Sequence, residues 1–285
     1  MFSEMLIALL ISASVASDAH LRGVALYKQQ KYADAIAALQ LAAKQEAPAT
    51  ADYRESMLLI GQSYFMLSKS ALAIPWLEKV PDVTEANYML GYAYLQSADR
   101  EKSEAAFARL FGLQPATARA HVVAGEMMLK KEFEDQAIIE IGKALALDPN
   151  VPKAHYLLGE IAIVKGDIDG AISDLKKEIA IDPSFSMAWY RLGDAYTRRE
   201  HWDLAIPNLE RAVWLNPDFS GPFILLGKCY FKQHNFSNAE GILQRALVLD
   251  PRNHEALYLL GQTQIALGRP EDGKATLNTL KNLQK

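Results

Sequence analysis

The chain has 285 residues, of which 50% are apolar and 22% are charged, so it is long enough to bury a large core. Its formal net charge is −4 and its basic residues are dispersed along the chain. This argues against a nucleic-acid-binding protein, because such proteins gather Lys and Arg into a positive surface. Cys229 is the only cysteine, which excludes an intramolecular disulfide.

The first sixteen residues have the pattern of a cleavable export signal. An apolar run from Met5 to Ile11 precedes Ser12-Ala13-Ser14-Val15-Ala16, the order of an apolar core and a cleavage site. We expect cleavage after Ala16 and a periplasmic or secreted protein, although residues 2–4 lack the Lys or Arg of a typical signal. The alternative is that residues 1–16 form a helix that caps the first unit of a cytoplasmic protein. The run is too short to cross a bilayer, so we expect no stable membrane span.

Beyond this segment, eight glycines recur at a nearly fixed period. They are Gly23, Gly61, Gly91, Gly125, Gly159, Gly193, Gly227 and Gly261, and the last six are each 34 residues apart. The first two intervals, 38 and 30, sum to 68, which is twice 34, so the register slips once between Ala47 and Val83 and then recovers. A period of this length is typical of helical repeat proteins. Because glycine costs about 1 kcal/mol in a helix, we expect each one to allow the close approach of a second backbone.

Other positions of the repeat keep the same register. If each glycine is position 8, then position 20 is small, positions 7 and 24 are apolar except at Arg22, and position 32 is proline in five repeats. Positions 4, 7, 8 and 11 form one apolar stripe, which predicts a first helix, and positions 20, 24 and 27 predict a second. Short polar turns such as Lys165-Gly166-Asp167 separate the two helices, and an Asp-Pro or Asn-Pro pair ends the second.

One segment carries a known motif most completely. The residues Trp189 to Tyr196, together with Ala205, Leu209 and Pro217, resemble the tetratricopeptide repeat pattern W-x2-L-G-x2-Y, A and P. Repeats that share this likeness begin near residues 16, 54, 84, 118, 152, 186, 220 and 254, so the resemblance covers residues 17–285. It implies an all-α fold, a right-handed α-solenoid of helix-turn-helix repeats in one extended array. Pentatricopeptide arrays, which bind RNA, have a longer usual period and lack this combination of Gly, Ala and Pro.

Nothing in the sequence points to catalysis, to a metal site or to a cofactor. The chain has no phosphate-binding glycine loop and no nucleophile-elbow serine. His121 and His155 fall at position 4 of adjacent repeats and are expected to lie about 8–10 Å apart, too far to share one metal, so we interpret them as packing residues. The other four histidines fall near helix starts or turns and are expected to be solvated. We therefore expect no enzyme activity.

The family resemblance places the first helices on the concave side of the array, where binding usually occurs. Positions 2, 5, 9 and 12 form the stripe beside the packed one. We predict a partner-binding groove at positions 5 and 9 that contains Tyr88, Tyr92, Glu126, Tyr156, Glu160, Tyr190, Asp194, Lys228 and Tyr258. Its three acidic residues favour a protein or peptide partner with Lys or Arg. The alternative is that the position-5 tyrosines pack between repeats and that the acidic residues only solvate the surface.

The sequence therefore favours a non-catalytic scaffold or adaptor that binds a peptide or a helix of a partner protein. The alternative is an accessory or regulatory subunit of an enzyme or assembly complex, which docks through the ends of the array. Apolar residues of the last repeat also predict weak self-association through that repeat.

Overall fold

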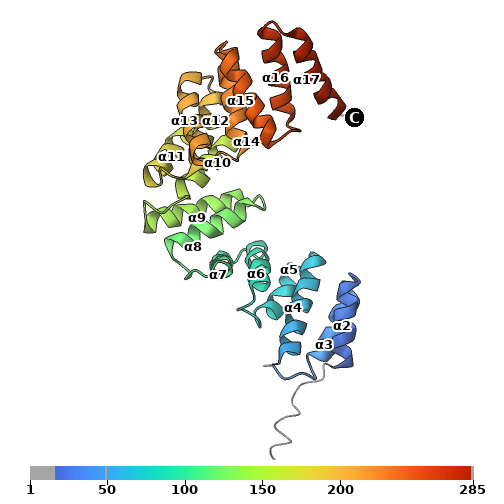
Figure 1. Ribbon diagram of the computed structural model, residues 1–285. Helices are drawn as coiled ribbons and strands as arrows, with labels where there is room; N and C mark the ends of the chain where they lie inside the picture. Colours follow the sequence, from blue (N-terminus) through green and yellow to red (C-terminus); the bar gives the residue numbers. More distant parts are fainter. Residues whose placement is uncertain (1–16, 49, 284–285) are drawn as a thin grey trace, which may run out of the picture. The chain divides into compact units, whose positions relative to one another are not determined.

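The computed structural model describes residues 17–48 and 50–283. The predicted export signal at residues 1–16 lies outside the described part of the chain. Within the described residues the structure contains sixteen helices and no strand, as the sequence predicts (Figure 1). None of these helices is both long enough and apolar enough to cross a bilayer.

The helices pair into hairpins, and the hairpins form two compact units that divide between Leu147 and Asp148. The single array predicted over residues 17–285 spans both units and stays a prediction. The first unit contains α2 (Asp18–Lys28), α3 (Tyr32–Ala42), α4 (Ala51–Met66), α5 (Ser70–Leu77), α6 (Thr84–Gln96), α7 (Arg100–Leu110), α8 (Ala118–Leu129) and α9 (Glu134–Leu147). The second unit contains α10 (Ala154–Lys165), α11 (Ile168–Ile181), α12 (Ser186–Arg198), α13 (Trp202–Leu215), α14 (Ser220–Lys232), α15 (Phe236–Leu249), α16 (His254–Ala266) and α17 (Pro270–Leu283).

The slip in the glycine register corresponds to an irregular second hairpin. Its first helix, α4, has 16 residues and begins at Ala51, while its second helix, α5, has only 8 residues. Thr50 caps α4, because its side chain accepts a hydrogen bond from the backbone N–H of Tyr53. The first helix of this hairpin is therefore longer than its neighbours and the second is shorter, which restores the register at α6.

Each glycine of the repeat faces the residue at position 24 of its own hairpin. A Cβ placed on Gly193 would lie 2.6 Å from both Cγ and Cδ2 of Leu209, and the other seven meet Leu39, Leu77, Phe107, Ile141, Leu175, Leu243 and Leu277 in the same way. The sequence predicted a close backbone neighbour, but the nearest atoms are those of the position-24 side chain. The glycine is needed because a large apolar residue of the second helix packs directly onto the first.

The turn between the two helices of every hairpin contains one residue with positive φ, always at position 15. Two of these residues are glycine, and the other six are Gln30, Ser68, Ala98, Glu132, Glu200 and His234. A non-glycine residue in this left-handed conformation costs about 1–2 kcal/mol, because its Cβ crowds the following carbonyl oxygen. The tight turn is kept because both helices are buried against neighbours.

This strain makes Ala98→Gly a stabilising substitution. Relief of the strain at φ 59° outweighs the extra flexibility of glycine in the unfolded chain, so the free energy of unfolding is expected to rise by about 0.5 kcal/mol. Urea denaturation measures it. Ala25→Gly is the matched control, since Ala25 lies inside α2, where glycine should cost about 1 kcal/mol. A fall of similar size in both variants would contradict the assignment of strain to the turn.

A buried carboxylate caps the first helix of the second unit. Glu178 of α11 is fully buried and accepts hydrogen bonds from the backbone N–H groups of Lys153, at 2.7 Å, and Tyr156, at 3.1 Å. These are among the donors that a helix leaves unpaired at its N-terminus. Glu178 therefore caps α10 from the second helix of the same hairpin, where the side chain of Lys153 does not.

Candidate functional site

The first helices of successive hairpins contact one another within each unit. α2 contacts α4 and α4 contacts α6, while in the second unit the same contact recurs from α10 through α12 and α14 to α16. Among the described residues, contacts of comparable extent do not join successive second helices. The first helices therefore lie on the inner side of each stack, where the sequence analysis places the binding face.

The predicted site residues fall in both units. Tyr88, Tyr92 and Glu126 belong to the first unit, and the other six belong to the second. Tyr88 is 36% exposed, and its ring meets that of Tyr92 edge-on with centroids 5.0 Å apart.

Tyr92 cannot contact a partner, so its assignment to the groove is wrong. It is only 3% exposed and its ring packs edge-on against Phe107, with centroids 5.0 Å apart. Its hydroxyl donates a hydrogen bond to the carbonyl oxygen of Met127 at 2.9 Å. Tyr92 is therefore a core residue that joins α6 to α8, and its ring packs against that of Tyr88.

Two tyrosines of the second unit pack between repeats. Tyr156 meets Phe185 and Tyr190 meets Phe219, each pair edge-on with centroids 5.0 Å apart. Phe185 and Phe219 directly precede the next first helix, so this contact joins consecutive hairpins. Such aromatic pairs add about 0.5–1.5 kcal/mol beyond the area they bury. Tyr258 is 50% exposed in α16.

The acidic run does not form a free negative surface. Glu126 lies 3.5 Å from Lys130, and Asp194 lies 3.1 Å from Arg198 one turn along the same helix. Asp194 is also buried. Lys130 and Arg198 therefore compensate the negative charges that were predicted to attract a basic partner.

Two further ion pairs join neighbouring first helices. Oε1 of Glu160 lies 2.5 Å from Nε of Arg191, an electrostatic contact in which this nitrogen makes no well-aligned hydrogen bond. Lys228 lies 3.1 Å from Glu255. Burial, with Glu160 beside the ring, raises the pKa of Tyr156. These residues stabilise the stack and leave no excess of either charge.

An apolar hollow lies on the inner face of the first unit. Its volume is about 430 Å³, and its lining comes from four helices. The lining residues are Tyr27, Gln62, Phe65, Met66, Thr84, Glu85, Tyr88, Met89 and Leu110. Five of these nine residues occupy the predicted stripe at positions 2, 5, 9 and 12. The stripe thus marks a surface of mainly apolar side chains with one carboxylate at its edge.

Sequence reasoning named only Tyr88 among these residues. It considered positions 5 and 9 and passed over position 12, which holds Tyr27 in the first repeat and Phe65 in the second. The aromatic residues at position 12 were therefore a signal that could have located the hollow. Met66, at position 13, is 58% exposed and is the most accessible large apolar side chain in the lining.

Ionisation of Tyr92, in the core next to the hollow, should make the protein less stable at alkaline pH. Burial raises the pKa of Tyr92 to about 12, with the neighbouring Tyr88 adding to the effect. In the unfolded chain a tyrosine ionises near about pH 10. The stabilisation is therefore complete below that pH and is lost as the pH rises towards about 12.

We expect Tyr92→Phe to reduce this alkaline loss, because phenylalanine does not ionise. Urea denaturation at about pH 9 and about pH 11.5 measures the loss in each protein. The difference between the two pH values should be smaller in Tyr92→Phe than in the wild type, even though the variant also loses the hydrogen bond to Met127. An equal difference would show that Tyr92 ionises as freely in the folded protein as in the unfolded chain.

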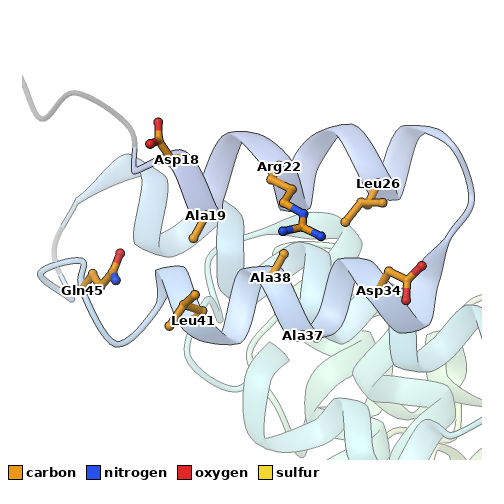
Figure 2. Close-up of a pocket in the computed structure, with 9 residues that line it drawn as sticks. All are labelled: Asp18, Ala19, Arg22, Leu26, Asp34, Ala37, Ala38, Leu41 and Gln45. Carbon is orange, nitrogen blue, oxygen red and sulfur yellow. The ribbon is translucent and has the colours of Figure 1, made fainter.

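A second hollow, of about 700 Å³, lies between α2 and α3 of the first hairpin. Figure 2 shows the side chain of Arg22 extending between the two helices, with Ala38 opposite it and Asp34 near one end. Arg22 occupies position 7, which is buried and apolar in later hairpins, for example at Leu90 and Leu192. Among the described residues Arg22 is exposed, which suits a charged side chain at this position.

His121 and His155 take part in ion pairs inside their own hairpins. Nδ1 of His121 lies 2.6 Å from Glu140, and Nδ1 of His155 lies 3.0 Å from Asp174. The expectation that His20 is solvated is wrong, because it is buried and its Nδ1 lies 2.9 Å from the hydroxyl of Ser56. Within the described residues, no three or more His, Cys, Asp or Glu side chains are placed to hold a metal ion.

Family comparisons agree with this architecture. Four family models, each described as a tetratricopeptide repeat, match residues 20–85, 84–117, 135–185, 188–222 and 232–285. No curated protein matches the chain at a significant level.

Several solved structures share the fold. MamA from Desulfovibrio magneticus RS-1, from residue 41 to its end, is 22% identical with a TM-score of 0.54, and the match covers 59% of this chain and 94% of that one. YrrB, described as a TPR protein with an unusual peptide-binding site, is 23% identical with a TM-score of 0.54, covering 59% and 86%. The pilF protein of Pseudomonas aeruginosa is 18% identical with a TM-score of 0.57, covering 70% and 91%. At these identities the likeness shows the fold alone. The family models show that this chain belongs to the tetratricopeptide repeat family.

Proposed function

We propose that this protein is a non-catalytic scaffold that binds a segment of a partner protein in the apolar hollow of its first unit. The observation that carries the proposal is the convergence of Tyr27, Met66 and Tyr88 from three consecutive first helices. Tetratricopeptide repeat proteins are typically interaction scaffolds, and this hollow lies on the face formed by the first helices.

The lining indicates what kind of segment fits. Methionine is flexible and adapts to different apolar shapes, while tyrosine offers a rigid ring with little loss of conformational entropy. A hollow of about 430 Å³ is within the usual range of ligand sites. An amphipathic helix or extended segment that inserts one or two large apolar side chains would bury this surface. The partner is recognised mainly by shape and apolar area, with Glu85 at the rim available to a basic flanking residue.

Met66→Glu tests this proposal. Random peptides displayed on phage are selected on the full-length protein, and the affinity of an enriched peptide is measured by fluorescence anisotropy. A charge in the lining of the hollow should weaken binding by more than about tenfold, as expected for an anchor residue of an interface. Leu67→Glu is the matched control, because Leu67 is the adjacent residue, is 37% exposed and does not line the hollow. Equal affinities in the two variants would contradict the proposed site.

We also propose that the protein is exported. The support is the apolar run from Met5 to Ile11 and the position of Ser17, whose side chain caps α2 by accepting from the backbone N–H of His20. N-terminal sequencing of the native protein should begin at Ser17. A native protein that keeps Met1 would rule out cleavage.

A further inference from the structure

In the second unit, the second helix of each hairpin carries basic and apolar side chains that form another exposed surface. Position 26 of the repeat is basic in six consecutive repeats, at Lys79, Arg109, Lys143, Lys177, Arg211 and Arg245. Position 29 lies one turn further along the same helix face. In α13 and α15 this position holds Trp214 and Val248, which are 69% and 68% exposed.

Most of the position-26 side chains already have partners in their own hairpin. Lys143 lies 2.8 Å from Glu140, and Lys177 lies 3.1 Å from Asp174. Arg109 donates a hydrogen bond to the side-chain oxygen of Asn87 at 3.1 Å. These contacts account for the basic residue in those repeats.

Arg211 and Arg245 differ, because no carboxylate among the described residues forms an ion pair with either. The guanidinium of Arg211 lies over the ring of Trp214, with 4.3 Å between its central carbon and the ring centroid. This stacking holds the cation beside an aromatic ring that stays open to solvent. Planar guanidinium groups bind carboxylates through two parallel hydrogen bonds, so both arginines are suited to an acidic ligand.

Apolar residues extend this surface. Leu204, two turns before Arg211 in α13, is also exposed. Gly241, one turn before Arg245 in α15, has open space around it, so a ligand can approach the backbone there. We name Leu204, Arg211, Trp214, Arg245 and Val248 the basic-aromatic patch. Because the same repeat position faces the same side of the array in consecutive repeats, one ligand can contact both arginines.

We propose that the basic-aromatic patch binds an acidic segment of a partner protein, with carboxylates on Arg211 and Arg245 and an apolar side chain over Trp214 and Val248. The uncompensated charge of the two arginines selects the acidic ligand, and exposed Trp and Arg are the residues that most often anchor protein interfaces. Membrane attachment through anionic lipids typically uses about four to eight clustered basic residues, more than this patch offers. Nucleic-acid binding likewise relies on many phosphate contacts.

Peptide selection on the full-length Met66→Glu variant tests the patch separately from the hollow. Enriched 16-residue peptides should be rich in Asp and Glu beside a large apolar residue. Their affinity should fall by more than about tenfold in the double variant Arg211→Glu/Arg245→Glu and also in Trp214→Ala. The double variant Lys232→Glu/Lys281→Glu makes the same charge change on α14 and α17, two helices that contribute no residue to the patch, and should keep the affinity within about twofold.

Three results would overturn the proposal. The first is a set of enriched peptides without acidic residues. The second is an equal loss of affinity in both double variants, which would show only a general charge effect. The third is sedimentation with phosphatidylserine vesicles that the Arg211→Glu/Arg245→Glu variant abolishes, which would assign the patch to a membrane surface. A failure of the hollow leaves these results unaffected, because the selection is made with the hollow blocked.

Discussion

Gly193→Ala is expected to destabilise the second unit by about 1–3 kcal/mol, although alanine is the better helix former. The added methyl group would lie 2.6 Å from Cγ and Cδ2 of Leu209, and the carbonyl oxygen of Ala205 lies 3.5 Å from the same point. Cγ is the branch point of the leucine, so the side chain cannot avoid the contact by moving one terminal methyl group. α12 and α13 must therefore separate, and the fully buried Leu209 loses packing.

Gly241→Ala is the matched control, since it makes the same change inside α15 of the same unit. No atom lies within 4 Å of a Cβ at Gly241, so the gain in helix propensity should raise stability by about 0.5–1 kcal/mol. Urea denaturation followed by circular dichroism gives both free energies, and hydrogen exchange shows whether α12 and α13 open first. Shifts of the same sign in the two variants would contradict the packing role assigned to the glycines at position 8.

Phe107→Ala is expected to destabilise the first unit by about 3–5 kcal/mol. Phe107 is fully buried, packs on Gly91 and meets the ring of Tyr92 edge-on. The other seven glycines at position 8 meet aliphatic residues, so this hairpin alone has an aromatic ring at position 24. Removing it leaves a large cavity between α6 and α7.

The substitution Phe107→Leu restores the aliphatic residue of the other repeats and should cost less than about 1.5 kcal/mol. It tests how the core positions the lining of the hollow, because the ring of Phe107 packs against Tyr92 and that of Tyr92 packs against Tyr88. Thermal unfolding of both variants, with the affinity for an enriched peptide, separates the two effects. A Phe107→Ala protein as stable as Phe107→Leu would show that the cavity collapses and that the ring is not required.

The repeat register could be predicted because it depends on contacts inside one hairpin. The pairing of position 8 with position 24 recurs eight times, so the helix order follows from glycine spacing alone. The first helices begin at residues 18, 51, 84, 118, 154, 186, 220 and 254, close to the expected starts. The largest difference, three residues at α4, lies within the irregular joint.

The binding face was harder to predict because it depends on contacts between hairpins. Tyr92 occupies the same repeat position as the half-buried Glu126, yet the large ring at position 24 of its own hairpin provides an apolar neighbour and buries it. Glu160 was predicted to offer a negative charge to a partner, but Arg191 of the next first helix pairs with it. The pairing of Tyr156 with Phe185 and of Tyr190 with Phe219 has a constant spacing of 29 residues, which a search for aromatic pairs could have found.

The hollow itself depends on three repeats around the register slip, where α4 is long and α5 is short. The most direct test of its role uses the methionine methyl groups as probes. Met66 and Met89 line the hollow, whereas Met128 is buried outside it and Met187 lies in the second unit. In a nuclear magnetic resonance titration of protein labelled at the methionine methyl carbons, an enriched peptide should shift the signals of Met66 and Met89 and leave those of Met128 and Met187 in place. Shifts confined to Met187, with Met66 unchanged at saturation, would contradict binding in the hollow.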